Sequence, residues 1–76
     1  MNKQRKEALR ELMEEIANVR DSVETILEEE EEYRDNMPEN LRSSEKFSIS
    51  EEACGYLEEC IDGLDSALSG IESAMA

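Results

Sequence analysis

The stretch LRELMEEIANVRDSVETILEEEEEY, residues 9–33, contains the clearest structural pattern in this chain. Its apolar residues recur at alternating steps of three and four, the heptad pattern of a helix that packs one face against another helix. Glu30 interrupts this series within a run of five glutamates, residues 28–32. The predicted apolar seam consists of Leu9, Leu12, Ile16, Val19, Val23, Ile26 and, beyond the interruption, Tyr33. Met13 and Leu27 lie one position beyond this seam and widen the apolar stripe.

The second half of the chain repeats the pattern. A seam of alternating three- and four-residue steps continues to the end of the chain, and a further apolar column lies beside it. One column of this seam is small throughout, which allows a neighbouring helix to approach closely. The seam residues are Ala53, Leu57, Cys60, Leu64, Ala67, Ile71 and Ala74, and the neighbours that flank the seam are Cys54, Ile61, Leu68 and Met75.

Residues 34–48 read as a connector, because polar turn formers gather there and Pro38 disfavours helical geometry at Met37. A short helical turn is expected to begin at Pro38. Ser48 and Glu51 fit a capping box, which predicts that the second helix begins near residue 49.

Together these patterns predict an all-α fold, an antiparallel, coiled-coil-like two-helix hairpin. The chain is expected to form a single domain, residues 1–76, with helices at about 2–33 and 49–75. A chain this short buries only ~60% of its unfolded surface. Since both stripes are wider than one neighbour needs, we expect two copies to pair into a four-helix bundle.

Charged residues predict two details of the hairpin. A glutamate cannot be buried without a partner, so we expect the seam to open at Glu30 and the hairpin to splay at its connector end. The second detail concerns the start of the first helix, where an antiparallel arrangement places four basic residues near Asp65 and Glu72. These basic residues are Lys3, Arg5, Lys6 and Arg10.

Four residues of the second helix have no obvious role in a simple bundle. Gly63 and Gly70 lie seven apart, and each either marks a helix end or lets another surface come close. Cys54 and Cys60 are separated by ~9 Å along a helix axis and point apart. They are predicted to be free thiols of a reducing compartment, and an intermolecular disulfide is the alternative.

The formal net charge of −13, from 21 acids and 8 bases, repels nucleic acid and anionic membranes. It favours a protein partner with a basic surface, although acidity can also serve solubility alone. No apolar run is long enough to span a bilayer, and no apolar segment follows the basic start, so a cytosolic location is expected.

Acidic residues recur every seven positions and form straight columns on both predicted helices. These columns either are the solvated outside of a bundle or imitate the phosphate lines of nucleic acid. The acids expected to contact a partner are Glu28, Glu31, Glu32, Asp35, Glu51, Glu52, Glu58, Glu59, Asp62, Asp65 and Glu72. The apolar residues expected to form the core or an oligomer interface are Leu9, Leu12, Ile16, Val19, Val23, Ile26, Leu57, Ile61, Leu64, Leu68 and Ile71.

Enzymatic chemistry is not expected. The chain has no histidine and no glycine-rich phosphate loop, so it lacks a base for either cysteine and any di-iron or zinc ligand set. We therefore expect no catalytic residues, no cofactor and no specific metal site.

The segment Asp35-Asn36-Met37-Pro38-Glu39-Asn40-Leu41, between a glutamate run and an acidic heptad helix, resembles a group of small acidic helical proteins. Phages and prophages of Gram-positive bacteria encode these proteins. The resemblance implies a phage accessory protein acting in the host cytosol, and small acidic ones are often inhibitors of host defence, of which anti-CRISPR proteins are one kind.

The functional hypothesis is therefore an inhibitor that binds a basic surface of a nucleic-acid-handling defence complex, either by nucleic-acid mimicry or by interfering with assembly. The alternative is a structural or adaptor coiled coil that joins protein subunits through its apolar stripe.

Overall fold

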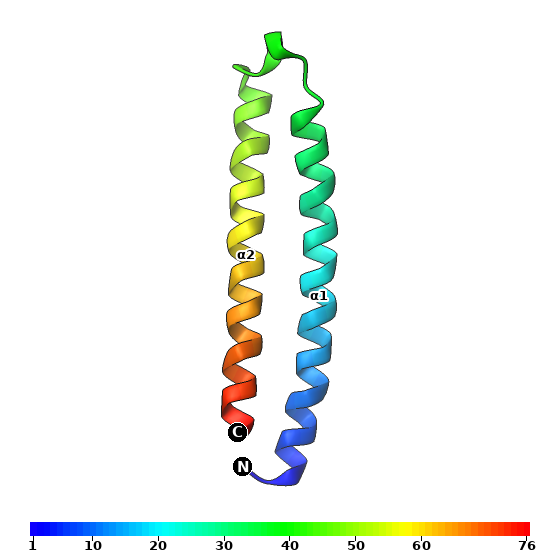
Figure 1. Cartoon of the computed structure of the whole chain (residues 1–76), viewed down its shortest axis with the longest axis vertical. Helices are drawn as coiled ribbons and strands as arrows, with labels where there is room; N and C mark the ends of the chain where they lie inside the picture. Colours follow the sequence, from blue (N-terminus) through cyan, green and yellow to red (C-terminus); the bar gives the residue numbers. More distant parts are fainter.

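A computed structural model of the chain describes residues 1–76 throughout, and two long helices make up most of it. Helix α1 spans Lys3–Asp35, helix α2 spans Glu45–Met75, and one turn of 3₁₀ helix, η1, spans Glu39–Leu41. The two long helices lie side by side in opposite directions, with both chain termini at one end (Figure 1). The chain is all-helical, and the predicted helical hairpin is confirmed.

The second helix begins one turn earlier than the predicted position near residue 49. The Ser44 hydroxyl accepts a hydrogen bond from the Phe47 backbone N–H at 3.3 Å and so caps α2, while Ser48 lies inside the helix. Ser44, rather than the predicted Ser48, is therefore the N-cap residue. This earlier start places Phe47 in line with the core positions of α2, where its ring is half-buried.

The connector is consequently shorter than predicted and comprises residues 36–44. The helical turn expected at Pro38 is present as η1, for which Pro38 is the N-cap residue. The Arg42 side chain ties the connector to the end of α1 by donating to the carbonyls of Met37 and Asp35, both at 3.4 Å.

The core lies along a different register of α1 from the predicted one. The buried apolar residues are Leu27, Cys54 and Ile61, with Val23 and Leu57 packed against them. On α1 the residues that face α2 are the half-buried or buried Leu9, Met13, Ile16, Arg20, Val23, Leu27, Glu30 and Arg34. Of the predicted seam, Leu12, Val19, Ile26 and Tyr33 are instead exposed, at 46%, 51%, 55% and 52%.

Side-chain size and polar pairing explain this shift. On α2 the large residues Ile61, Leu68 and Met75 face α1, while the small column that begins at Ala53 and Cys60 lies beside the contact. Packing the larger side chains between the helices buries more apolar area. The cost is that three charged residues of α1 enter the seam, and polar contacts at its edge compensate for this.

The hairpin does not splay at Glu30, so that prediction is wrong. The Ser50 hydroxyl donates to Glu30 Oε2 at 2.5 Å, and Glu30 is only half-buried. Ser50 is 3% exposed and Cys54, one turn further along α2, is 1% exposed. A hydrogen bond to a charged carboxylate is strong enough to keep the helices together where the apolar series is interrupted.

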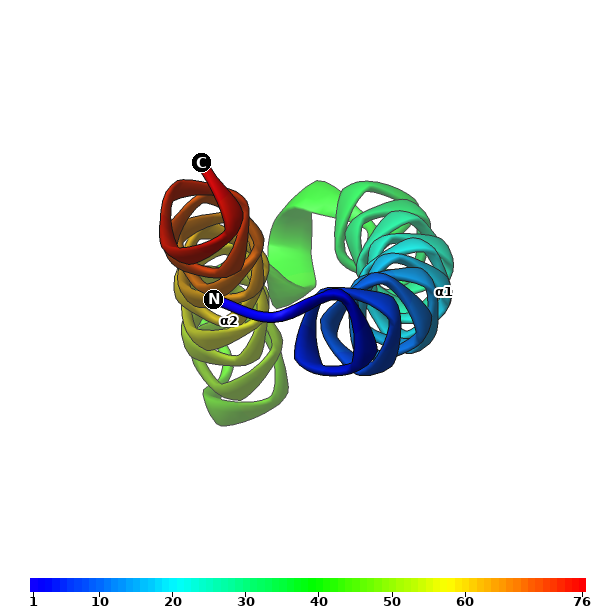
Figure 2. The same ribbon diagram turned by 90° about the horizontal axis from the view of Figure 1, so that it is seen from below.

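The molecule is a thin rod, with Cα extents of 59 × 15 × 13 Å. Seen end-on, the two helices form a pair with no third element across either flank (Figure 2). Only four of the 76 residues are buried, and three of these are apolar. A hydrophobic core of this size leaves two long sides of the hairpin open for contacts with other molecules.

Candidate interaction surfaces

The two open sides of the hairpin differ in chemistry. Beside its core positions each helix carries one column of residues on either flank. The contact between Arg20 and Asp65 marks one side, while Tyr33, Ile49 and Ala53 line a common hollow on the other. We call the first side the acidic face and the second the apolar face.

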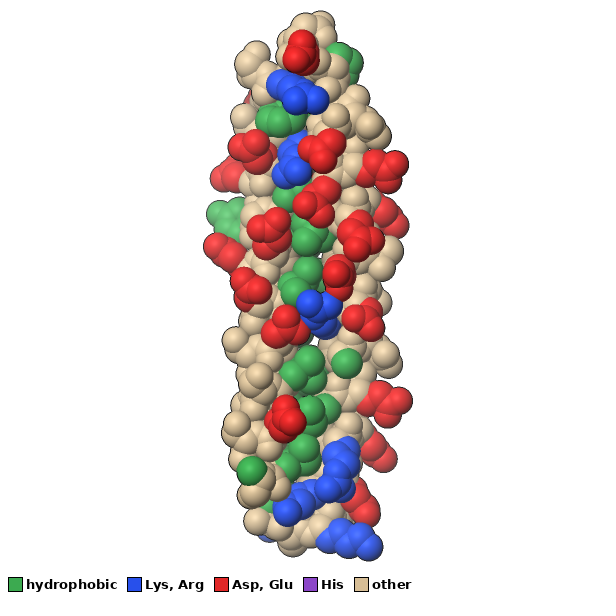
Figure 3. Space-filling view, viewed as in Figure 1, with side chains coloured by type: hydrophobic (Ala, Val, Ile, Leu, Met, Phe, Trp, Pro, Cys, Tyr) green, Lys and Arg blue, Asp and Glu red, His purple; other side chains and the backbone are tan.

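The acidic face carries two rows of carboxylates, one along each helix. Figure 3 shows these rows as acidic side chains on both sides of a narrow apolar seam, with basic side chains in the seam and clustered at the lower end of the same face. Repeats of seven space the acids of a column by ~10.5 Å along each helix. The register assigns to this face Glu14, Asp21, Glu24, Glu28, Glu31 and Asp35 from α1 and Glu51, Glu58, Asp62, Asp65 and Glu72 from α2.

Arg20 connects the two rows near the middle of the rod. Its Nε donates to Asp65 Oδ1 at 2.8 Å, and its Nη1 pairs with Glu24 on the same helix. The hydrogen bond to Asp65 raises the pKa of Arg20 above its ordinary value, despite partial desolvation of the guanidinium. Arg20 is therefore occupied by the carboxylates of its own chain.

Arg34 is held in a similar way at the connector end. Its Nε donates to Asp35 Oδ1 at 3.1 Å, and this hydrogen bond raises the pKa of the guanidinium. Since both arginines of the seam are paired internally, the remaining acids of this face are free to meet cations of another molecule.

Most of the predicted partner-contacting acids come together on the acidic face. Eight of the eleven lie in its two rows. The other three, Glu32, Glu52 and Glu59, lie on the sides of α1 and α2 that point away from the opposite helix, and they are exposed. No group of three or more acidic or cysteine side chains converges in a way that could hold a metal ion.

The apolar face gathers residues from both helices that one copy of the chain leaves exposed. Helix α1 supplies a column of large side chains at positions 12, 19, 26 and 33. Helix α2 supplies two columns of mostly small residues, one at positions 53, 60, 67 and 74 and the other at positions 49, 56, 63 and 70. Ile49 is 57% exposed and Tyr56 is 66% exposed. Charges are sparse here: Glu15 and Glu29 lie at its margin on α1, while Arg5 and Lys46 continue the columns of α1 and α2 at opposite ends of the rod.

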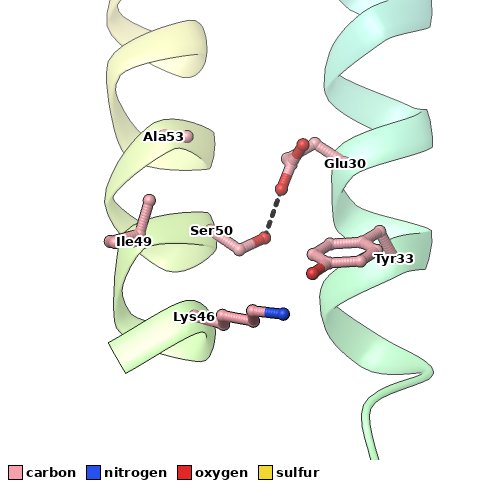
Figure 4. A pocket seen from close by; sticks show the side chains of 6 residues that line it. All are labelled: Glu30, Tyr33, Lys46, Ile49, Ser50 and Ala53. Atoms are coloured by element: carbon pink, nitrogen blue, oxygen red, sulfur yellow. Dashed lines mark hydrogen bonds between the residues drawn. The ribbon is translucent and has the colours of Figure 1, made fainter. Parts of the chain in front are cut away.

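A hollow of about 270 Å³ lies at the connector end of the apolar face. Tyr33 forms one wall, Ile49 and Ala53 form the other, and the hydrogen-bonded pair of Glu30 and Ser50 lies between the helices (Figure 4). Lys46 extends from α2 toward α1 at the lower end of this hollow (Figure 4). The hollow thus continues the apolar face.

Gly63 and Gly70 lie inside α2, so neither marks a helix end. A Cβ at either position would meet no other atom within 4 Å apart from its own helix neighbourhood. Each glycine costs ~1 kcal/mol relative to alanine in a helix interior. Nothing within a single hairpin explains either glycine.

The predicted pairing of the N-terminal bases with Asp65 and Glu72 is wrong. Asp65 pairs with Arg20, which lies within reach in the core register of α1, and Glu72 has no ion pair within 4 Å. The bases Lys3, Arg5, Lys6 and Arg10 also make none, so this end of the rod carries unpaired positive charge.

The two cysteines are free thiols in different environments. Cys54 belongs to the core, and burial raises the pKa of its thiol, while nearby Arg34 opposes this shift and nearby carboxylates add to it. Cys60 is exposed on the apolar face, midway along α2.

The sequence alone did not assign Arg20 or Ile49 to these faces, whereas Tyr56 shares a seven-residue column with Gly63 and Gly70. A signal for Arg20 existed, because positions 9, 13, 16, 20, 23 and 27 also follow alternating steps of three and four. This second series contains the charged Arg20, whereas the series through Leu12, Val19 and Ile26 is apolar throughout, so the pattern alone favours the latter.

Comparison with protein-family models, curated proteins and solved structures finds no match to this chain. Neither long helix contains a segment apolar enough to cross a membrane.

Proposed function

We propose that this chain is a non-enzymatic, phage-encoded inhibitor that binds a basic surface of a host defence complex through its acidic face. The supporting observation is the pair of exposed carboxylate rows on one side of a rigid rod, with the arginines between them already held by Asp65, Glu24 and Asp35. A groove that binds nucleic acid is lined with lysine and arginine to neutralise phosphates. Two parallel lines of carboxylates offer the same groove an alternative ligand.

Charge reversal on matched rows of α2 tests this proposal. Glu51, Glu58 and Glu72 belong to the acidic face and make no ion pair, so their replacement by lysine leaves the contact between Arg20 and Asp65 intact. The control replaces Glu45, Glu52 and Glu59 with lysine, which changes the charge equally on the outward side of the same helix.

The tagged chain is used to capture proteins from a lysate of a Gram-positive host. The captured complex is then challenged with double-stranded DNA and with salt. We expect displacement by both competitors, loss of capture in the acidic-face variant and retention in the control. Equal capture by both variants contradicts a role for the acidic face.

A second candidate function rests on the apolar face. Exposed Leu12, Val19 and Ile26 suit an adaptor that joins protein subunits through this side. In that case serine at these three positions abolishes capture, while the acidic-face variant behaves as wild type.

The apolar face also supports the self-association expected from the width of the stripes. Its area, from Cα extents of 59 × 15 Å, is about 900 Å². Stable complexes typically bury about 800 Å² on each partner. A second copy covering this face gives a four-helix bundle and leaves both acidic faces outward.

A further inference from the structure

We infer that two copies cover each other's apolar face in a tip-to-base arrangement, with α2 packed against α2 of the second copy and the two Cys60 side chains beside the two-fold axis. This inference rests on the self-association proposed above and specifies its geometry. Here the tip is the connector end of the rod, and the base is the end that carries both termini.

Only two two-fold arrangements place the apolar faces of two hairpins in contact. An axis along the rod puts tip on tip and α1 on α2 of the partner. An axis across the rod puts tip on base, with each helix packed antiparallel against its own counterpart.

The columns of α2 are self-complementary about its midpoint. α2 spans Glu45–Met75, so Cys60 is its central residue. When α2 meets a second α2 centred there, a residue n positions before Cys60 faces the residue n positions after it. Ala53 then faces Ala67, and Cys60 faces Cys60.

The large residues of the neighbouring column face the glycines under the same axis. Tyr56 of one copy lies within one residue of the level of Gly63 of the other, and Ile49 lies within one residue of Gly70. Tyr56 and Ile49 are two of the most exposed apolar side chains in the chain, and the glycines have open space above them. A glycine opposite a tyrosine gives the ring a place to pack.

The same two-fold axis also pairs apolar residues of α1 with their counterparts in the second copy. The contacts of Arg20 with Asp65 and of Glu30 with Ser50 show which residues of the two helices share a level. Interpolation between them places Val23 about level with Cys60. The axis therefore crosses α1 midway between Val19 and Ile26, so these two residues face each other across the copies.

Charge favours this arrangement over the tip-to-tip one. The base of the rod carries four bases without ion pairs, of which Lys3 and Arg10 continue the column of Glu24 and Glu31 on the acidic face. The tip is net acidic, because glutamates 28–32 with Asp35, Glu39 and Glu45 outnumber Arg34, Arg42 and Lys46. Tip-to-base packing brings each basic end to an acidic tip. Tip-to-tip packing brings two acidic tips together, which like-charge repulsion opposes.

Cysteine cross-linking tests the register. In a Cys60→Ser background, Ala53→Cys and Ala67→Cys are prepared as separate chains and oxidised with copper phenanthroline, alone and mixed. We expect a band of twice the chain mass, 2 × 8.7 = 17.4 kDa, from the mixture and not from either chain alone. In the tip-to-base pair, two cysteines at position 53 lie 14 residues apart along α2, or ~21 Å.

The Cys60→Ser chain is the control, because its remaining thiol, Cys54, is buried. Circular dichroism verifies that every variant keeps its helical content, and light scattering reports its mass before oxidation. A dimer whose mixture fails to cross-link overturns the tip-to-base arrangement alone. A monomeric mass for the wild-type chain at 100 μM overturns the self-association as well. Neither outcome affects capture of a partner by the acidic face.

Discussion

Alanine at the glycines of α2 distinguishes a solitary hairpin from a pair of hairpins. Gly55 and Gly63 both lie inside α2, and a Cβ at either has open space in one copy. A solitary hairpin therefore predicts the same result at both sites. Each alanine should stabilise the fold by about 1 kcal/mol through helix propensity, which for a domain of this size raises Tm by roughly 4–8 °C.

The pair of hairpins predicts opposite results. Gly55 lies outside the apolar face, so Gly55→Ala keeps its full gain in stability. At Gly63 the added methyl group meets the ring of Tyr56 from the other copy, and overpacking of this kind costs about 1–3 kcal/mol. Gly63→Ala should then weaken dimerisation by about 5- to 140-fold for each such contact, since ~1.4 kcal/mol is one order of magnitude in Kd.

Thermal unfolding followed by circular dichroism measures both effects. It is recorded for each variant at 2 and 200 μM chain, because the Tm of a dimer rises with concentration. We expect Gly55→Ala to be more stable than wild type at both concentrations, and Gly63→Ala to lose its gain at the higher one. Equal gains at both concentrations would show that no partner approaches Gly63.

Three further predictions concern the core, the thiols and the dimer. Leu27→Ala should lower the free energy of unfolding by about 2–5 kcal/mol in urea titrations, because Leu27 is buried between the helices. Ile26→Ala, measured at 2 μM, should lower it by far less, because Ile26 is exposed in one copy. A larger loss at Ile26 than at Leu27 would mean that the predicted seam, and not the observed one, faces α2. Stability should fall as pH rises above about 9, where the unfolded chain releases the proton that the buried Cys54 thiol retains; a Cys54→Ala chain with the same pH dependence contradicts this. Glu15→Lys should tighten dimerisation in sedimentation experiments, because the tip-to-base axis brings Glu15 to Glu29 of the other copy; an unchanged Kd argues against that axis.

The hairpin itself was predictable from the heptad series because apolar periodicity determines secondary structure and the pairing of adjacent helices. The connector was predictable for the same local reason, since Pro38 must interrupt a helix. The start of α2 was not, because Ser44 and Ser48 both qualify as caps, and only tertiary packing of Phe47 distinguishes them.

The register of the core was the main error, and its cause is physical. Each helix carries two overlapping apolar stripes, but within one copy of the chain only one of them can face the other helix. The sequence favours the stripe without Arg20, whereas the fold accepts that arginine because Asp65 of the other helix reaches it at 2.8 Å. Such a contact spans 45 positions in the chain, so local patterns do not reveal it.

This error also affects the candidate surfaces. Leu12, Val19 and Ile26, predicted for a core or oligomer stripe, remain available only for contacts between molecules. The rows of acids were predictable, because a repeat of seven keeps residues on one side of a helix whatever that helix packs against. Their assembly into a face with acids of the other helix required the three-dimensional register.

The mass of the chain in solution shows directly whether a second copy covers the apolar face. Light scattering coupled to size-exclusion chromatography is performed at 10 and 100 μM in 150 mM salt. We expect 17.4 kDa, twice the 8.7 kDa of one chain, and a mass nearer 8.7 kDa for a Leu12→Ser, Val19→Ser, Ile26→Ser variant that remains helical. A wild-type mass of 8.7 kDa at both concentrations contradicts this expectation.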